Sequence, residues 1–222
     1  MSGRNVQCRL SVFSRMAQFV GERFVDIGGG KGSYAVELLN FCQHLSLVDV
    51  DPDAIGRARE LLQGAPKVDF VVARAENTGL PADTYDAAFL IEVLDHVDDP
   101  AAVLRETFRL LKPGGRLYVA VPNKAFPMET HPIRFGKAFF LPHWAPFLPW
   151  FGWLHRRIAT ARVFTARALA KMARDAGFTD IQAEYLMPPF ERHPRLQKAS
   201  ERLGRTPLRR FGVSICATML KP

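Results

Sequence analysis

The sequence has 222 residues, a hydrophobic content of 48% and a charged content of 23%, which suit one globular domain with a sizeable core. It contains no run of roughly 18 apolar residues and no signal-peptide pattern, which argues against a helical membrane span and favours the cytoplasm. Its net charge is +8, and its three scattered cysteines, Cys8, Cys42 and Cys216, fit neither a disulfide framework nor a zinc site.

An amphipathic helix is predicted over 6–20, where apolar residues recur at helical intervals, and we expect it to cover the edge of the sheet or of a ligand site. An apolar strand over 24–27 then runs into a glycine-rich turn, and helical spacing resumes at Tyr34. Glycine has no Cβ and tolerates positive φ, so the turn can pass closely beneath a bound nucleoside. The dinucleotide fingerprint G-x-G-x-x-G would need glycine at Ser33, which weakens a plain NAD-binding interpretation.

The pattern that is present, Asp26-x-Gly28-x-Gly30-x-Gly32, resembles the first motif of the class I S-adenosyl-L-methionine (SAM) dependent methyltransferases. The resemblance implies an α/β, Rossmann-like three-layer sandwich with helices on both faces of a seven-stranded, mostly parallel sheet. It also implies the strand order 3-2-1-4-5-7-6 with the last strand antiparallel. SAM would be the cofactor and S-adenosyl-L-homocysteine the product, with Asp26, Gly28, Gly29 and Gly30 in the cofactor site.

Residues 45–49 are predicted to form the second strand, which ends on Asp49. Open α/β sheets bind ligands at the carboxyl ends of their strands, where an acid can accept both hydroxyls of a ribose. The resemblance covers residues 48–52 and therefore assigns Asp49 to the ribose, with Val50 beside it. Asp51 is expected to cap a helix that starts at Pro52.

A third strand is predicted over 68–73, followed by Arg74, Ala75 and Glu76. The resemblance implies that an acid at the first of these positions meets the adenine amino group. Arginine has no acceptor, so Arg74 departs from the family's pattern. Arg74 can stack on the adenine, or Glu76 can supply the carboxylate.

The fourth strand is predicted over 86–91, and the segment from Glu92 to His96 follows it. This segment resembles the small-molecule branch related to the quinone-biosynthesis methyltransferases, which places Glu92 near the methionine end of SAM. His96 can hold the loop by a hydrogen bond or act as a base. The Asn-Pro-Pro-aromatic sequence of base-amine methylation is absent at this strand end.

A helix is predicted from Pro100 to Leu111, a turn over 111–115 and a fifth strand over 116–121. Residues 123–162 then form an insertion, which we expect to be a lid over the carboxyl ends of the strands within a single domain of residues 1–222. Three prolines and all three tryptophans lie within 138–154, a proline density that excludes a long helix. Such an aromatic segment suits an apolar acceptor pocket, a membrane contact through 138–157 that includes His155, or ordinary core packing.

The last part of the chain is predicted to contain a helix over 165–177 with Thr165 as N-cap and Gly177 after its end, a strand over 178–187, a basic connector over 188–210 and a strand over 213–220. Residues 1–150 hold 16 Lys+Arg and 17 Asp+Glu, whereas residues 151–222 hold 14 and 5, so the basicity belongs to the C-terminal third. A basic face of this kind can meet nucleic acid, anionic lipid or an acidic substrate, or can simply be solvated.

Together these features predict a SAM-dependent methyltransferase that acts on the oxygen or carbon of a small, apolar acceptor. Catalysis would rest on proximity and orientation, with His131 as the first candidate base and Glu129 or His96 next. No ligand-like spacing indicates a metal. Two alternatives remain, an RNA methyltransferase that uses the basic C-terminal third and a protein that binds SAM without catalysis.

Overall fold

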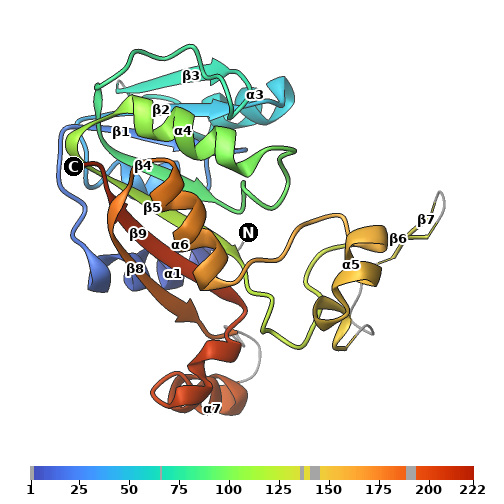
Figure 1. The fold of residues 1–222 in the computed structure, drawn as a ribbon. Coiled ribbons are helices and arrows are strands. Elements are labelled where there is room, and N and C mark those ends of the chain that lie inside the picture. The colour runs from blue at the N-terminus through green and yellow to red at the C-terminus, as the bar shows by residue number, and fades with distance from the viewer. Residues whose placement is uncertain (1–2, 66, 136–137, 141–145, 189–193) are drawn as a thin grey trace.

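The computed structural model describes residues 3–65, 67–135, 138–140, 146–188 and 194–222 (Figure 1). Within them, seven strands form one sheet in the order β3-β2-β1-β4-β5-β9-β8. The strands are β1 (Arg23–Ile27), β2 (His44–Asp49), β3 (Val68–Val72), β4 (Tyr85–Ile91), β5 (Leu111–Pro122), β8 (Thr179–Leu186) and β9 (Ser214–Leu220). Strand β9 pairs antiparallel with β5 and β8, while the pairs among β1 to β5 are parallel. The predicted order is therefore confirmed, because β8 and β9 are the expected sixth and seventh strands.

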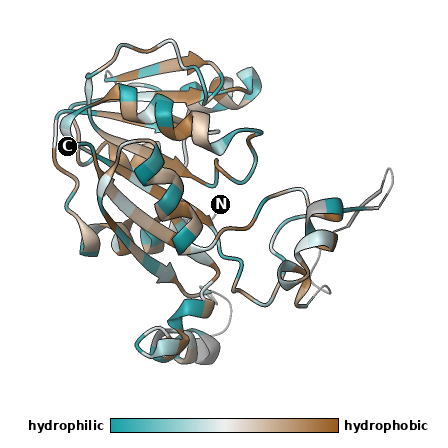
Figure 2. Ribbon diagram, in the orientation of Figure 1, coloured by the Kyte–Doolittle hydropathy of each residue, from teal (hydrophilic) through white to brown (hydrophobic). Residues whose placement is uncertain are grey.

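Helices cover both faces of the sheet, which confirms the three-layer sandwich. The helices are α1 (Gly3–Met16), α2 (Ala35–Leu38), α3 (Pro52–Leu61), α4 (Pro100–Leu110), α5 (Gly152–Ile158), α6 (Ala166–Asp175) and α7 (Pro194–Leu203). One buried cluster joins α4 and α6 to one face, and a second joins α1, α2 and α3 to the other. Successive residues of a strand point to opposite faces, so Phe24 and Val25 of β1 enter different clusters. Figure 2 shows the hydrophobic strands between helices that are striped with polar residues.

The predicted caps of two helices are confirmed. The Asp51 carboxylate accepts a hydrogen bond from the backbone N–H of Asp53 at the start of α3, and the Thr165 hydroxyl accepts one from Ala168 N–H at the start of α6. Gly177 follows α6 with a φ of +102°. These contacts satisfy N–H groups that would otherwise lack a partner within the helix.

The structure differs from the sequence-based boundaries in three places. Helix α1 ends at Met16 rather than near Val20, which is exposed. Strand β5 begins at Leu111, so the expected turn over 111–115 is part of the strand, where Leu111 pairs with Tyr85 before an irregularity. The expected connector over 188–210 contains α7 and a 3-10 turn, η2 (Pro207–Phe211). The prolines misled the prediction because Pro194 and Pro207 stand at the first position of each turn, where proline is tolerated.

The segment between β5 and α6 lies beyond the carboxyl ends of the strands (Figure 1). Its described parts contain a hairpin of β6 (Ile133–Phe135) and β7 (Ala138–Phe140), the turn η1 (Leu148–Trp150) and the seven-residue helix α5. Trp150 and Trp153 are 48% and 67% exposed, which does not fit the packing interpretation for them. Trp144 lies outside the described residues. Within those residues, no helix combines the length and apolar character needed to cross a membrane.

A buried hydrogen bond between Ser46 of β2 and Tyr85 of β4 offers a test of the core. The two hydroxyl oxygens lie 2.9 Å apart, and both residues are buried. Tyr85→Phe and Ser46→Ala should each lower the free energy of unfolding by about 1–3 kcal/mol, because each leaves one buried hydroxyl without its partner. The double variant should lose clearly less than the sum. Urea unfolding measures all three, and strict additivity would contradict this account.

Candidate functional site

Backbone hydrogen bonds tie the glycine turn after β1 to the carboxyl end of β2. The N–H groups of Gly28 and Gly29 both donate to the carbonyl of Val48, at 2.7 and 3.1 Å, which ties the turn to β2. Gly28 and Gly30 have φ values of +73° and +54°, the left-handed region that favours glycine. A Cβ on Gly28 would lie 2.4 Å from the side chain of Val93. The turn therefore requires glycine for both its conformation and its packing.

Asp49 stands at the carboxyl end of β2 and faces this turn. Its Oδ2 accepts the N–H of Gly30 at 2.8 Å, and its Oδ1 accepts the N–H of Asp51 at 2.9 Å. Each carboxylate oxygen has a second lone pair to offer. The side chain is thus fixed in place while it keeps acceptor capacity toward the cavity.

Asp26 lies beneath the turn, within β1, and is 2% exposed. Its Oδ2 has no hydrogen-bond partner among the described residues. Burial, followed by repulsion from Asp49, raises the pKa of Asp26 to about 7. The site therefore has a buried carboxyl that is about half protonated near pH 7, where an ordinary aspartate is fully ionised.

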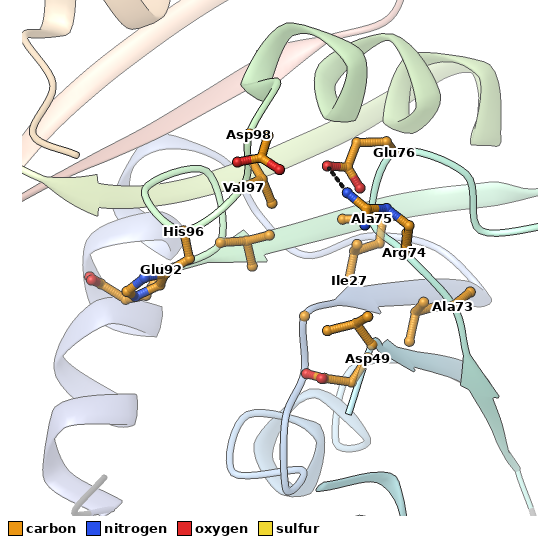
Figure 3. A pocket seen from close by; sticks show the side chains of 14 residues that line it. Ile27, Asp49, Ala73, Arg74, Ala75, Glu76, Glu92, His96, Val97 and Asp98 are labelled. Atoms are coloured by element: carbon orange, nitrogen blue, oxygen red, sulfur yellow. Dashed lines mark hydrogen bonds and ion pairs between the residues drawn. The ribbon is translucent and has the colours of Figure 1, made fainter. Parts of the chain in front are cut away.

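A cavity of about 400 Å³ opens above the carboxyl ends of β1, β2 and β4. Figure 3 shows Asp49 and the segment 73–76 on one side of it and Glu92 and His96 on the other. Of the residues predicted for a cofactor, the cavity wall contains Gly28, Asp49, Val50, Arg74, Ala75, Glu76 and Glu92. Asp26, Gly29 and Gly30 lie in and under the turn instead. The wall also contains Asp98, which the sequence prediction missed.

Arg74 and Glu76 interact with each other at the rim of this cavity. The Nη2 of Arg74 donates to Oε1 of Glu76 at 3.3 Å, and the Arg74 side chain is 65% exposed (Figure 3). Exposure makes this pair a weak contribution to stability. The pair instead affects the rim of the cavity, because it turns the Glu76 carboxylate toward Arg74.

Glu92 follows β4 with a φ of +58°, a conformation that costs a non-glycine residue on the order of 1–3 kcal/mol. Arg9 of α1 holds it: the guanidinium donates to Glu92 Oε1, to the hydroxyl of Tyr34 at 3.0 Å and to Ser214 Oγ at 3.3 Å. The sequence prediction missed Arg9, since nothing in the spacing of α1 marks a residue whose side chain reaches the end of β4. A strained backbone held by a buried ion pair points to a functional constraint at Glu92.

His131, from the insertion, lies against the loop that follows β4. Its Nε2 is 3.5 Å from Asp95 Oδ2 and 3.7 Å from Glu92 Oε2, and its ring centroid is 5.4 Å from that of His96. Burial lowers the pKa of His131, but the surrounding carboxylates of Glu129, Asp95 and Glu92 outweigh burial and raise it. Of the three predicted catalytic residues, His96 lines the cavity, and the fold brings His131 against His96 without making it part of the cavity wall.

The third predicted catalytic residue, Glu129, is buried behind His131. Its Oε1 accepts the N–H groups of Thr130 and His131, both at 2.9 Å, and its Oε2 lies 2.7 Å from Nε2 of His155. Burial raises the pKa of Glu129, but the hydrogen bonds from His131 and His155 outweigh it and lower the pKa to about 2. A carboxylate that is so acidic and fully engaged is a poor proton acceptor.

Asp95, which the sequence prediction also missed, is buried below both imidazoles. Burial, followed by the charge of Glu92, raises the pKa of Asp95 to about 6. Asp95, His96 and His131 each place one ligand-type atom within 4.8 Å of the others, a grouping that a metal ion could also use. Linear spacing could not reveal it, because His131 lies 35 positions beyond His96 along the chain.

A second cavity, of about 580 Å³, borders the first. Both are lined by His96, Val97 and Asp98, and the wall of the second also contains residues of the insertion, including Lys124 and Arg162. Arg162 binds the intervening loop directly, since its N–H donates to Asp95 O and its Nη2 to Asp98 O, both at 2.9 Å. His96 therefore lies at the border of two cavities, each large enough for a small molecule.

The profile of the methyltransferase domain family matches residues 4–183, most of the chain. Curated relatives include the ubiquinone biosynthesis O-methyltransferase of Xanthomonas oryzae pv. oryzae, 31% identical over 118 residues, and that of Xylella fastidiosa, 35% identical over 119 residues. Each match covers 52% of this chain and 49% or 48% of the relative. The chain thus spans about half the length of the curated relatives it matches.

Solved structures share the fold over almost the whole chain. An S-adenosylmethionine dependent methyltransferase from Mesorhizobium loti superposes with a TM-score of 0.69 at 19% identity, covering 96% of this chain and 97% of that one. A possible histamine N-methyltransferase from Thermotoga maritima gives 0.66 at 21% identity, covering 98% and 89%. At these identities the likeness shows the arrangement of the chain and not its substrate.

The buried carboxyl beneath the turn predicts a pH-dependent stability difference. Because the folded-state pKa of Asp26 is raised to about 7, folding opposes its ionisation, and its protonated form is lost from the folded state as the pH rises through 7. Asp26→Asn should therefore raise the melting temperature, by a margin that widens from about pH 4 to pH 7 and is constant above. Calorimetry across this range measures the margin. A difference that is the same at every pH would contradict the raised pKa.

Proposed function

The chain belongs to the methyltransferase domain family, and from that membership we propose that it transfers a methyl group from SAM to a small acceptor. The observation that carries the proposal is the cavity over the glycine turn, with Asp49 at the end of β2 and Glu92 at the end of β4. Its volume of about 400 Å³ suits a nucleoside-sized ligand. The same family membership argues against the plain NAD-binding interpretation.

We assign the cofactor's parts to this cavity from the residues upward. Gly30 leaves room for it, since a Cβ there would meet nothing closer than 3.9 Å. The free acceptor capacity of Asp49 suits the two hydroxyls of a ribose. Segment 74–76 would border the adenine through Ala75 and the Arg74–Glu76 pair, and Glu92 would face the methionine end.

The cofactor would supply an electrophilic methyl group on a sulfonium. The acceptor would enter through the second cavity and present its oxygen or carbon in line with the sulfur beside His96. For a hydroxyl acceptor, the C–S bond breaks as the C–O bond forms, and His131 takes the hydroxyl proton. The product of the donor is S-adenosyl-L-homocysteine. Glu129 would not serve as the base, because it is buried and already accepts three hydrogen bonds.

The names of the curated relatives favour O-methylation of a small molecule over methylation of RNA by the basic C-terminal third. We propose an acceptor with an apolar part. In support, the wall of the second cavity contains five apolar side chains, Val97, Pro149, Ala159, Ala161 and Val163. Outside that wall, four aromatic side chains are exposed on the insertion, Phe147, Trp150, Phe151 and Trp153.

The same aromatic side chains support a peripheral membrane contact through 138–157, with the exposed Arg157 toward anionic head groups. His155, which was expected to share in that contact, is buried instead and pairs with Glu129. We place the enzyme in the cytoplasm, which agrees with the free thiols of Cys42 and Cys216. The insertion would then act as a lid that joins the acceptor cavity to the membrane surface.

Removal of the acid at the end of β2 tests the cofactor site. Asp49→Ala should weaken SAM binding by about 2–3 kcal/mol, because a carboxylate that accepts the ribose hydroxyls is lost. Isothermal titration calorimetry gives the affinity, and the melting temperature controls for a disturbed turn. Asp53→Ala, an exposed acid in the first turn of α3, is the matched control. Unchanged affinity in Asp49→Ala would remove Asp49 from the site.

Removal of the imidazole on the insertion tests the catalytic assignment. His131→Ala should leave SAM affinity intact and slow methyl transfer by roughly 10²–10⁴-fold, the usual contribution of a positioned base. His44→Ala, at the opposite end of β2, is the control. Full activity in His131→Ala would move the base to His96 or remove the need for one. Loss of wild-type activity on chelation, restored by a divalent cation, would make Asp95, His96 and His131 metal ligands instead.

A further inference from the structure

The insertion ties a buried histidine to the segment that carries His131. His155 of α5 and Glu129 are 2% and 5% exposed, and their Nε2 and Oε2 atoms are 2.7 Å apart. The two residues are 26 positions apart along the chain. The proposed transfer step gives neither side chain a chemical role, although His155 also lines the second cavity. A buried carboxylate such as that of Glu129 is costly unless its hydrogen bonds are well satisfied.

The other carboxylate oxygen of Glu129, Oε1, sets the position of His131. It accepts the backbone N–H groups of both Thr130 and His131, so the chain folds around the carboxylate at this point. The same oxygen is 3.8 Å from Nδ1 of His131, and the Thr130 hydroxyl is 3.1 Å from that nitrogen. Both groups therefore lie on the Nδ1 side of the imidazole ring.

The opposite side of the ring faces Glu92, Asp95 and His96, of which Glu92 and His96 line the cavity over the glycine turn. Nε2 of His131 is directed at Asp95 and Glu92, and the ring of His96 stands edge-on to it. Arg9 in turn engages Glu92 from α1. A half-turn of the ring about its Cβ–Cγ bond would put Cδ2 in the place of Nδ1 and Cε1 in the place of Nε2. Contacts on the Nδ1 side therefore decide whether Nε2 or a carbon points toward Asp95 and Glu92.

We propose that Glu129 and His155 are positioning residues that hold the imidazole of His131 with Nε2 toward the acceptor. The proposal rests on the methyl-transfer function and adds that α5 takes part in it. Glu129 holds the base through its backbone N–H, with the Thr130 hydroxyl at Nδ1, and His155 is the group that fixes the carboxylate. The insertion is then required for turnover, beyond any role in covering the acceptor.

Two substitutions of His155 distinguish the effect of its hydrogen bond to Glu129 from the effect of its side-chain volume. His155→Phe keeps a ring and removes the hydrogen bond, which leaves Glu129 buried with one oxygen unpaired. His155→Gln keeps an N–H that can reach Oε2. We expect kcat to fall about 10- to 100-fold in His155→Phe, with the KM for SAM unchanged, and to recover to within a few-fold of wild type in His155→Gln, in line with the usual cost of losing an orienting partner.

Thr160→Ala is the matched control for simple support of the insertion. The Thr160 hydroxyl donates to Pro132 O at 2.7 Å, so it clamps the same segment without touching the Glu129 carboxylate. Because Thr160, like His155, lines the second cavity, this variant also controls for a changed cavity wall, and its kcat should fall far less than that of His155→Phe. If His155→Phe and Thr160→Ala lowered kcat in equal measure, with equal losses in melting temperature, the pair would be ordinary structural support and the proposal would be wrong.

The ring of His131 can also be followed without any turnover. With histidine labelled at its ring nitrogens, NMR of the SAM-bound protein distinguishes the two nitrogens, and His131→Ala identifies the signals. We expect the His131 signals to move in His155→Phe and to stay in His155→Gln and Thr160→Ala. Unchanged signals in His155→Phe would overturn the proposal. Moved signals, together with full activity in His131→Ala, would keep the positioning role and reject His131 as the base.

Discussion

The site depends on a constraint at the end of β1, where one carbonyl, that of Val48, accepts two successive N–H groups from Gly28 and Gly29. These two hydrogen bonds tie the turn after β1 to the neighbouring strand β2. A turn built from residues with a Cβ would collide with Val93 at one position and with Asp26 or Leu47 at the next. Glycine lets the turn pack this closely against those side chains, and the space above the turn therefore stays open. Asp49 then completes the cradle by fixing Gly30 from the neighbouring strand.

A second requirement is met by residues far apart in the chain. Glu92 stands in a left-handed conformation at the end of β4, where the local sequence offers it no support. Its support comes from Arg9 in α1, which also reaches Tyr34 and Ser214. A helix at one end of the chain and the last strand thus converge on one carboxylate. Helix α1 packs on the sheet face that it shares with α2 and α3, and through Arg9 it still helps to place Glu92 in the cavity wall.

The sequence predicted the sheet well and the insertion poorly, for physical reasons. Buried parallel strands such as β1 and β4 are short apolar runs that end in glycine or acidic residues, so their local patterns suffice. The order of the strands came from the motif at Asp26–Gly32, because periodicity cannot show which strands are neighbours. Prolines were misjudged at Pro194 and Pro207, since proline breaks a helix interior but also begins a helix. Several described partners of the site, among them Arg9, Asp95 and His155, left no local signal, because only tertiary packing brings them there.

These contacts change how the insertion should be understood. A lid that only covered an acceptor would need apolar contact and freedom to move, and its polar groups would face solvent. Here His155 points inward from α5, and the carboxylate it meets also binds the backbone beside His131. Arg162, at the other end of the insertion, holds the loop that carries Asp95 and Asp98. The insertion therefore holds both the backbone beside His131 and the loop that carries Asp95 and Asp98, and that loop borders both cavities.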